Sequence, residues 1–201
     1  MNPSAKRLLF VVGGIVVLAL GGALGWSLAR EASAPDRPDE YGSVTVTGAA
    51  LPPGTGPSDL EAPSFTTQTP DGVEISVTPG DGTPKVLVFL AHWCPHCQAE
   101  VPRIVAWHRD TSGLDGLEVV GVATATDRLR VNYPPSDWLE REGWPYPVAL
   151  DDADNSIARA YGVDSFPFFV VVDSEGRAVF RVSGELDTAT LDELMRTAAG
   201  L

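Results

Sequence analysis

Cysteine and basic residues are both scarce in this chain. Its 201 residues include two cysteines, which cannot build the disulfide framework of a small secreted scaffold. The 14 lysines and arginines are outnumbered by 27 aspartates and glutamates, which gives a formal net charge of −13. An acidic surface of this kind argues against nucleic acid or anionic lipid as a partner of the soluble part.

One long apolar run lies near the N-terminus. Residues 8–28 carry no charge and directly follow Lys6 and Arg7. About 20 helical residues cross the roughly 30 Å hydrocarbon core of a bilayer, and the preceding cations favour a cytoplasmic N-terminus. We therefore predict a cytoplasmic N-terminus over residues 1–7 and a transmembrane anchor over residues 8–29.

A cleaved signal sequence is the alternative interpretation of the same run. The sequences at 27–29 and 32–34 resemble small-x-small cleavage sites. In either case the rest of the chain is expected on the extracytoplasmic side of the cell membrane, where a disulfide can persist. The bilayer is then a partner only through residues 8–29.

The remaining sequence divides into a linker and one domain. Residues 30–59 are rich in proline, glycine, serine and threonine, which predicts a flexible linker, although residues 44–47 could form a short strand. Residues 60–201 alternate between strand and helix patterns. We predict strands at 64–67, 73–77, 86–91, 117–123, 148–150, 168–173 and 178–182, and helices at 95–109, 135–142, 154–161 and 188–199. This order predicts an α/β domain with a mixed sheet flanked by helices on both faces.

Both cysteines lie in one Cys-x-x-Cys segment. Cys94 and Cys97 directly follow the buried-type strand 86–91 and open the helix 95–109. A thiol at a helix N-terminus is stabilised as the thiolate by the macrodipole and by free backbone N–H groups. A structural disulfide across so short a loop would contribute only about 2 kcal/mol in the chain-entropy model. The pair is therefore predicted to be catalytic, with Cys94 as nucleophile, Cys97 as the less exposed resolving thiol and a reversible disulfide between them.

Three residues inside and beside this motif are predicted to support it. Pro95 suits the first helical turn, where a missing N–H is harmless. His96 would stabilise the Cys94 thiolate and make the pair a stronger oxidant. Trp93 is expected to shield the sulfur atoms from one side.

Four segments resemble the thioredoxin superfamily, and more closely its membrane-anchored TlpA- and ResA-like branch. They are residues 62–65 before an Asp-Gly turn, residues 88–97 with the two cysteines, residues 97–102, and residues 161–167. The resemblance covers residues 60–201 and implies a thioredoxin-like domain of AhpC/TSA-redoxin type. It also implies a thiol-disulfide oxidoreductase that needs no cofactor, acts on exported protein thiols and disulfides, and has a membrane redox partner of the CcdA/DsbD or quinone-linked type.

The resemblance assigns roles to three further residues. Glu100, one turn beyond Cys97, is the acid that tunes the thiol pKa in this branch, although it could instead be a solvated helix carboxylate. Pro167 stands at the family's cis-proline position. A cis bond from Phe166 would present the Phe166 backbone to a substrate strand.

The sequence is compatible with either direction of electron transfer and with more than one class of function. The TlpA- and ResA-like resemblance favours reduction, as in cytochrome c maturation, whereas the Pro-His dipeptide is found in DsbA-like oxidases and favours oxidation. One alternative is a metal-binding or metal-delivery module that uses His92, Cys94, His96 and Cys97, although closed zinc sites need four converging ligands. The other is a thiol peroxidase on the same fold.

Overall fold

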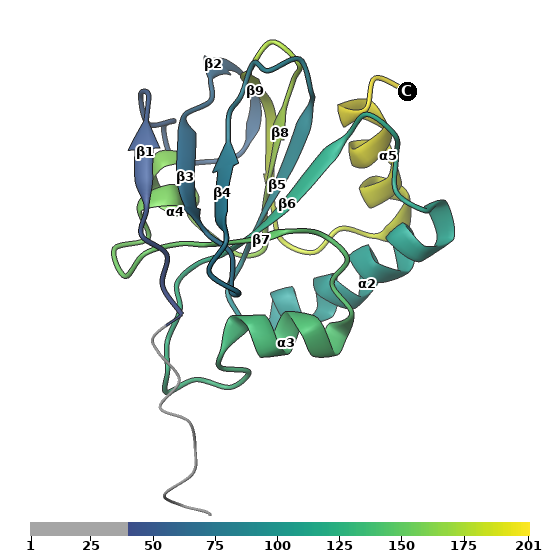
Figure 1. The fold of residues 1–201 in the computed structure, drawn as a ribbon. Helices are drawn as coiled ribbons and strands as arrows, with labels where there is room; N and C mark the ends of the chain where they lie inside the picture. Colours follow the sequence, from purple (N-terminus) through teal and green to yellow (C-terminus); the bar gives the residue numbers. More distant parts are fainter. Residues whose placement is uncertain (1–39) are drawn as a thin grey trace, which may run out of the picture. The chain divides into compact units, whose positions relative to one another are not determined.

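The computed structural model describes residues 40–201 (Figure 1). The predicted cytoplasmic segment 1–7, the predicted anchor 8–29 and the first ten residues of the predicted linker lie outside the described residues. Within residues 40–201, every helix is too short or too polar to cross a bilayer.

A six-stranded mixed sheet forms the centre of the domain, in the order β2–β9–β8–β5–β6–β7. Strand β5 pairs in parallel with β6 and antiparallel with β8, so it lies in the interior of the sheet. All residues of β5 and β8 are buried, as their continuous apolar runs predict for strands covered on both faces. The bounds are β2 Gly56–Glu61, β5 Lys85–Leu90, β6 Glu118–Ala123, β7 Val148–Leu150, β8 Phe168–Val172 and β9 Arg177–Ser183.

Helices cover one face of this sheet. They are α2 Pro95–Thr111, α3 Pro135–Glu142 and α5 Thr188–Ala198, and their apolar side chains pack with Val86, Val88 and Leu90 of β5. The N-terminus of α5 is capped by Asp187, as predicted, because its carboxylate accepts a 2.8 Å hydrogen bond from the Thr190 N–H.

A second, smaller sheet covers the opposite face, together with the short helix α4 Ser156–Ala160 (Figure 1). Its order is β1–β3–β4, with β1 Thr45–Thr47, β3 Ser64–Gln68 and β4 Glu74–Val77. Phe65 and Val77 pack against Leu87 and Phe89, the β5 side chains that alternate to this face. The prediction of helices on both faces is therefore confirmed for one face and is only partly right for the other.

The folded part begins earlier than the predicted linker 30–59 allows. Within it, β1 pairs with β3, as the short-strand alternative for 44–47 predicted, and β2 pairs with β9. Leu51 is buried, and the Arg181 guanidinium donates a 2.5 Å hydrogen bond to the Pro52 carbonyl. The Pro/Gly composition describes local backbone preference and carries no information on these distant partners. The other predicted helices and strands are present, with ends shifted by at most two residues.

Candidate active site

The two thiols lie where β5 passes into α2. Cys94 is the N-cap residue of α2 and Cys97 lies in its first turn, with Pro95 at the first helical position as predicted. Both are free thiols. Cys94 is 7% exposed and Cys97 is fully buried, which confirms that Cys97 is the less accessible of the two. Burial raises the pKa of Cys97 far above its usual range, and the neighbouring Cys94 and Glu100 raise it further.

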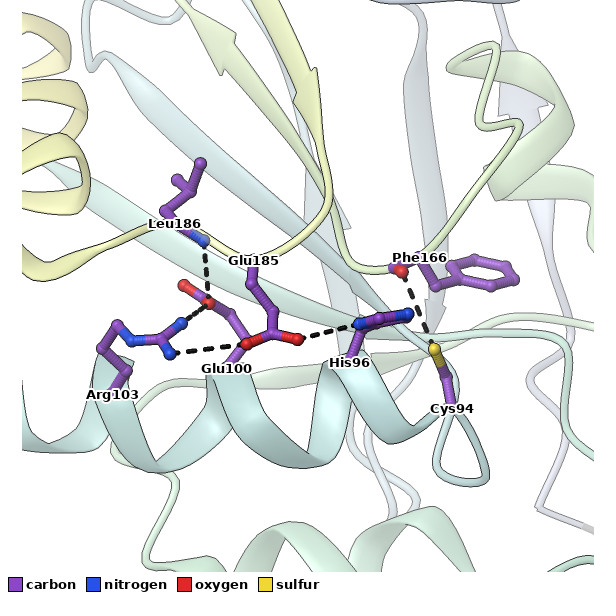
Figure 2. Close-up of polar contacts among 7 residues, drawn as sticks. All are labelled: Cys94, His96, Glu100, Arg103, Phe166, Glu185 and Leu186. Atoms are coloured by element: carbon purple, nitrogen blue, oxygen red, sulfur yellow. Dashed lines mark hydrogen bonds and ion pairs between the residues drawn. The ribbon is translucent and has the colours of Figure 1, made fainter.

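The segment before β8, which contains Phe166 and Pro167, also lies next to Cys94. The peptide bond between Phe166 and Pro167 is cis, which confirms the prediction. The Cys94 thiol points at the Phe166 carbonyl and donates to it over 3.6 Å (Figure 2). The fold thus brings the first cysteine and the predicted cis-proline together.

Three contacts hold the Trp93 ring beside Cys94. Its indole N–H donates a 2.7 Å hydrogen bond to the Ala125 carbonyl, and its ring meets the Phe166 ring edge-on, with 6.4 Å between centroids. The Arg130 guanidinium carbon lies 5.2 Å from the centroid of the indole ring, within cation–π range.

His96 faces a carboxylate that the sequence analysis did not identify. Its Nδ1 lies 2.8 Å from Glu185 Oε1, in the segment that leads from β9 to α5 (Figure 2). The hydrogen bond to His96 holds the pKa of Glu185 below its usual range. Arg103, one helical turn beyond Glu100, reaches the other oxygen of Glu185 at 3.5 Å. The His96 ring is therefore held by Glu185.

Glu100 is fully buried, so the alternative of a solvated helix carboxylate is wrong. Its Oε2 accepts a 3.0 Å hydrogen bond from the Leu186 N–H and a second hydrogen bond from Arg103, whereas Oε1 has no partner among the described residues. Burial raises the pKa of Glu100, and the Leu186 N–H and Arg103 offset only part of that rise. The protonated form is therefore favoured relative to a carboxylate in water.

His92 is a residue whose part in the site the sequence analysis missed. It is fully buried, and its Nδ1 lies 2.7 Å from the Val131 carbonyl while its Nε2 lies 3.1 Å from the Asp127 nitrogen. A neutral imidazole with its proton on Nδ1 satisfies both partners. Burial lowers the pKa of His92, which favours that neutral form.

This arrangement disagrees with the metal-binding alternative, because both nitrogens of His92 are already occupied by backbone groups. Across residues 40–201, no three or more His, Cys, Asp or Glu side chains are grouped so that they could hold a metal ion. A histidine at the end of a buried strand, directly before Trp93, was the available signal for a structural role.

The chain is similar to several known proteins. The Redoxin family model matches residues 57–195. The thiol:disulfide interchange protein DsbE of Escherichia coli K12 is 28% identical, in a match that covers 94% of this chain and 91% of DsbE. The thiol-disulfide oxidoreductase ResA of Bacillus subtilis is 25% identical, with 94% and 93% covered.

A solved structure is also similar to this chain. A secreted Mycobacterium tuberculosis disulfide oxidoreductase, described as homologous to E. coli DsbE, is 27% identical and superposes with a TM-score of 0.53. The match covers 68% of this chain and 95% of that structure. The predicted thioredoxin-like fold is confirmed by these similarities.

Proposed function

The chain belongs to the Redoxin family and is a thiol-disulfide oxidoreductase, and from this premise we propose that Cys94 and Cys97 exchange their dithiol and disulfide with protein substrates. The observation that supports the assignment is the asymmetry of the two thiols. Cys94 lies at a helix N-terminus next to the Phe166 carbonyl, whereas Cys97 is wholly buried and its pKa is strongly raised. The first thiol is built to react with a partner and the second with the first.

In the reductive direction, the Cys94 thiolate attacks one sulfur of a substrate disulfide. A Cys94–substrate bond forms, the substrate S–S bond breaks, and the departing sulfur takes up a proton. Cys97 then loses its proton and attacks the Cys94 sulfur, which closes the Cys94–Cys97 disulfide and releases the second substrate thiol. Two electrons pass from the dithiol to the substrate, and oxidation of a substrate is the exact reverse.

The raised pKa of Cys97 means that the second step needs a proton acceptor. We assign that role to Glu100, because it is buried one helical turn away and its Oε1 has no hydrogen-bond partner among the described residues. Its own raised pKa suits exchange of a proton with a thiol better than an ordinary carboxylate would.

Alkylation and trapping test the assignment of the two cysteines. Iodoacetamide at neutral pH should modify Cys94 and leave Cys97 intact in the reduced, folded chain. The Cys97→Ser variant should accumulate a mixed disulfide with a protein substrate, and Cys94→Ser should form none. Equal modification of both thiols, or trapping by Cys94→Ser, would contradict the assignment.

For direction, we propose that the chain acts as a reductant. The contact between His96 and Glu185 supports this, because an imidazolium paired with a carboxylate stabilises a neighbouring thiolate less than an unpaired one. A less stabilised thiolate makes the dithiol form a better electron donor. The oxidising contribution expected from the Pro-His dipeptide is reduced accordingly.

Equilibration with glutathione measures the reduction potential of the full chain. We expect a value nearer to about −270 mV, as in thioredoxin, than to about −120 mV, as in DsbA. Glu185→Gln should shift the potential toward the oxidising side, and the matched exposed variant Glu61→Gln should leave it unchanged. A wild-type potential near that of DsbA, or no response to Glu185→Gln, would refute the proposed direction.

For location, we propose that residues 8–29 anchor the chain in the cell membrane with the catalytic domain outside. The charge-free run after Lys6 and Arg7 supports this, as does similarity to a secreted mycobacterial relative. The substrates would then be exported protein thiols and disulfides, with a membrane protein of the CcdA/DsbD or quinone-linked type as the redox partner. Labelling of Cys94 in intact cells by a membrane-impermeant maleimide tests the orientation, and labelling only after lysis would contradict it.

A further inference from the structure

A polar loop with two exposed aliphatic side chains is bound to His92 and Trp93, the residues that precede Cys94. We call residues 127–132, between β6 and α3, the arginine loop. Leu129 is 96% exposed and Val131 is 65% exposed. Single exposed leucines are common on protein surfaces. Here two lie on one short loop, and a third residue of that loop, Arg130, lies over the ring of the partly exposed Trp93, which neighbours Cys94 in the chain.

The arginine loop is attached to the active-site segment itself. His92 binds both sides of the loop through its ring, at the Asp127 nitrogen and the Val131 carbonyl. The His92 carbonyl also accepts a 3.3 Å hydrogen bond from the Asn132 side chain and a 3.1 Å hydrogen bond from the Gln98 side chain in α2. The residue that holds the loop thus lies two positions before Cys94.

Two backbone positions, one just before the loop and one at its last residue, have a conformation that non-glycine residues seldom adopt. Ala125 has φ 49° and Asn132 has φ 62°. Such residues persist only where surrounding contacts determine them, and they concentrate at functional sites. The contacts are present, since the Ala125 N–H donates to the Asn155 side chain at 2.8 Å and the Ala125 carbonyl accepts from Trp93 at 2.7 Å.

The charge of the arginine loop is opposite to that of the chain. It contains two arginines against one aspartate, whereas the whole chain has a net charge of −13. Arg130 lies over the Trp93 ring and 3.4 Å from Asp127, with 60% of its side chain exposed. A guanidinium held in this position can bind a carboxylate close to the reacting sulfur.

We propose that the arginine loop is a docking site for the polypeptide substrate. Leu129 and Val131 contact an apolar side chain of that substrate, and Arg130 binds a carboxylate near its reacting cysteine. Because the loop is fixed before the substrate arrives, less conformational entropy is lost on binding than for a mobile loop. This inference rests on the proposed thiol-disulfide exchange and adds which substrate sequences react fastest in it.

Two synthetic peptides test the inference with the reduced full chain. Each is a 12-residue peptide with one cysteine in mixed disulfide with thionitrobenzoate, whose release is followed by absorbance. One peptide has leucine and glutamate beside the cysteine, and the other has serine and lysine at the same positions. The wild type should react about tenfold faster with the leucine–glutamate peptide, and added salt should reduce this preference.

Variants locate the effect on the loop. Leu129→Ser and Arg130→Gln should each lower the rate with the leucine–glutamate peptide about three- to tenfold. Their rates with the small uncharged reagent 2,2′-dithiodipyridine should stay within about twofold of wild type. The control Leu60→Ser, at a leucine that is 47% exposed on β2, should change neither rate.

The small reagent separates failure of this inference from failure of the proposed function. Equal rates of the wild type with both peptides, or variants that react like wild type, would overturn the docking site and leave the exchange reaction standing. Variants slowed equally with the small reagent would also overturn it, because the loop would then only support the active site. If Cys94→Ser releases thionitrobenzoate as fast as the wild type, the proposed function fails and the docking site with it.

Discussion

Replacing His92 with phenylalanine should lower stability and remove part of its pH dependence. The substitution keeps a buried aromatic ring but deletes the ring contacts to the Asp127 nitrogen and the Val131 carbonyl. Each buried polar group left without a partner costs about 1–3 kcal/mol. Since both groups belong to an exposed loop that water can reach after a small adjustment, we expect the lower half of that range for each. The free energy of unfolding should fall by about 2–4 kcal/mol.

The pH dependence follows from the lowered pKa of His92. Its ordinary value is 6.5, and burial moves it down in the folded chain. The unfolded chain therefore binds more protons than the folded chain in the window below 6.5. The stabilisation is complete above that value and is lost as the pH falls through the folded pKa. Two nearby carboxylates, Asp127 and Glu40, limit the shift because they favour the charged imidazole.

Urea denaturation of the wild type and His92→Phe at pH 7.5 and pH 5.5 measures both effects. The wild type should lose more stability between these two pH values than the variant does. Burial raises the pKa of Glu100 and of Asp151, and these acids act in the opposite direction in both proteins, so the difference between the proteins isolates His92. An unchanged pH response in His92→Phe would refute the reasoning.

Substitutions at three further positions test other parts of the structure. Burial raises the pKa of Glu100 above its ordinary 4.5, so the folded chain holds that proton more tightly than the unfolded chain does. The free energy of unfolding should therefore fall as the pH rises from 4.5. Glu100→Gln should make this fall less steep in urea titrations, and an equally steep fall in the variant would contradict the reasoning. Glu40 accepts hydrogen bonds from the N–H and hydroxyl of Ser136 at the start of α3, so Glu40→Ala should cost about 1 kcal/mol in chemical denaturation while Glu40→Gln retains most of that stability. Gly162 has φ +70°, and a Cβ there would lie 2.4 Å from the Pro52 carbonyl oxygen, so Gly162→Ala should lower the free energy of unfolding by about 1–3 kcal/mol; an unchanged thermal midpoint would show that this segment moves aside.

The elements of the main sheet could be predicted because their signals are local. A continuous apolar run such as Val86–Leu90 is buried on both faces in almost any α/β domain, and Asp187 marks a helix start by its chemistry alone. The positions of Cys94, Cys97 and Pro167 followed from a motif and a resemblance. Such features depend on neighbours within a few residues, or on an arrangement that many related chains share.

The contacts that tune the site depend on residues far apart in the chain. In the sequence, Glu100 is an ordinary helix carboxylate. In the structure, the segment before α5 packs over it, and the Leu186 N–H donates a hydrogen bond to it. The pairing of His96 with Glu185 spans 89 positions. The sequence positions of His96 and Glu185 do not indicate that the two side chains are in contact, because the contact depends on the path of the chain between β9 and α5.

The pairing of β2 with β9 sets a practical limit on how short the chain can be made. Strand β2 is the outermost strand of the main sheet, and it occupies the backbone hydrogen-bonding groups along one side of β9. A fragment cut at residue 62 would expose that side to solvent, next to the half-exposed Phe180. Bare strands of this kind recruit other copies of the same molecule. The truncated chain should therefore aggregate at protein concentrations at which the longer chain remains soluble, and light scattering would detect the aggregates.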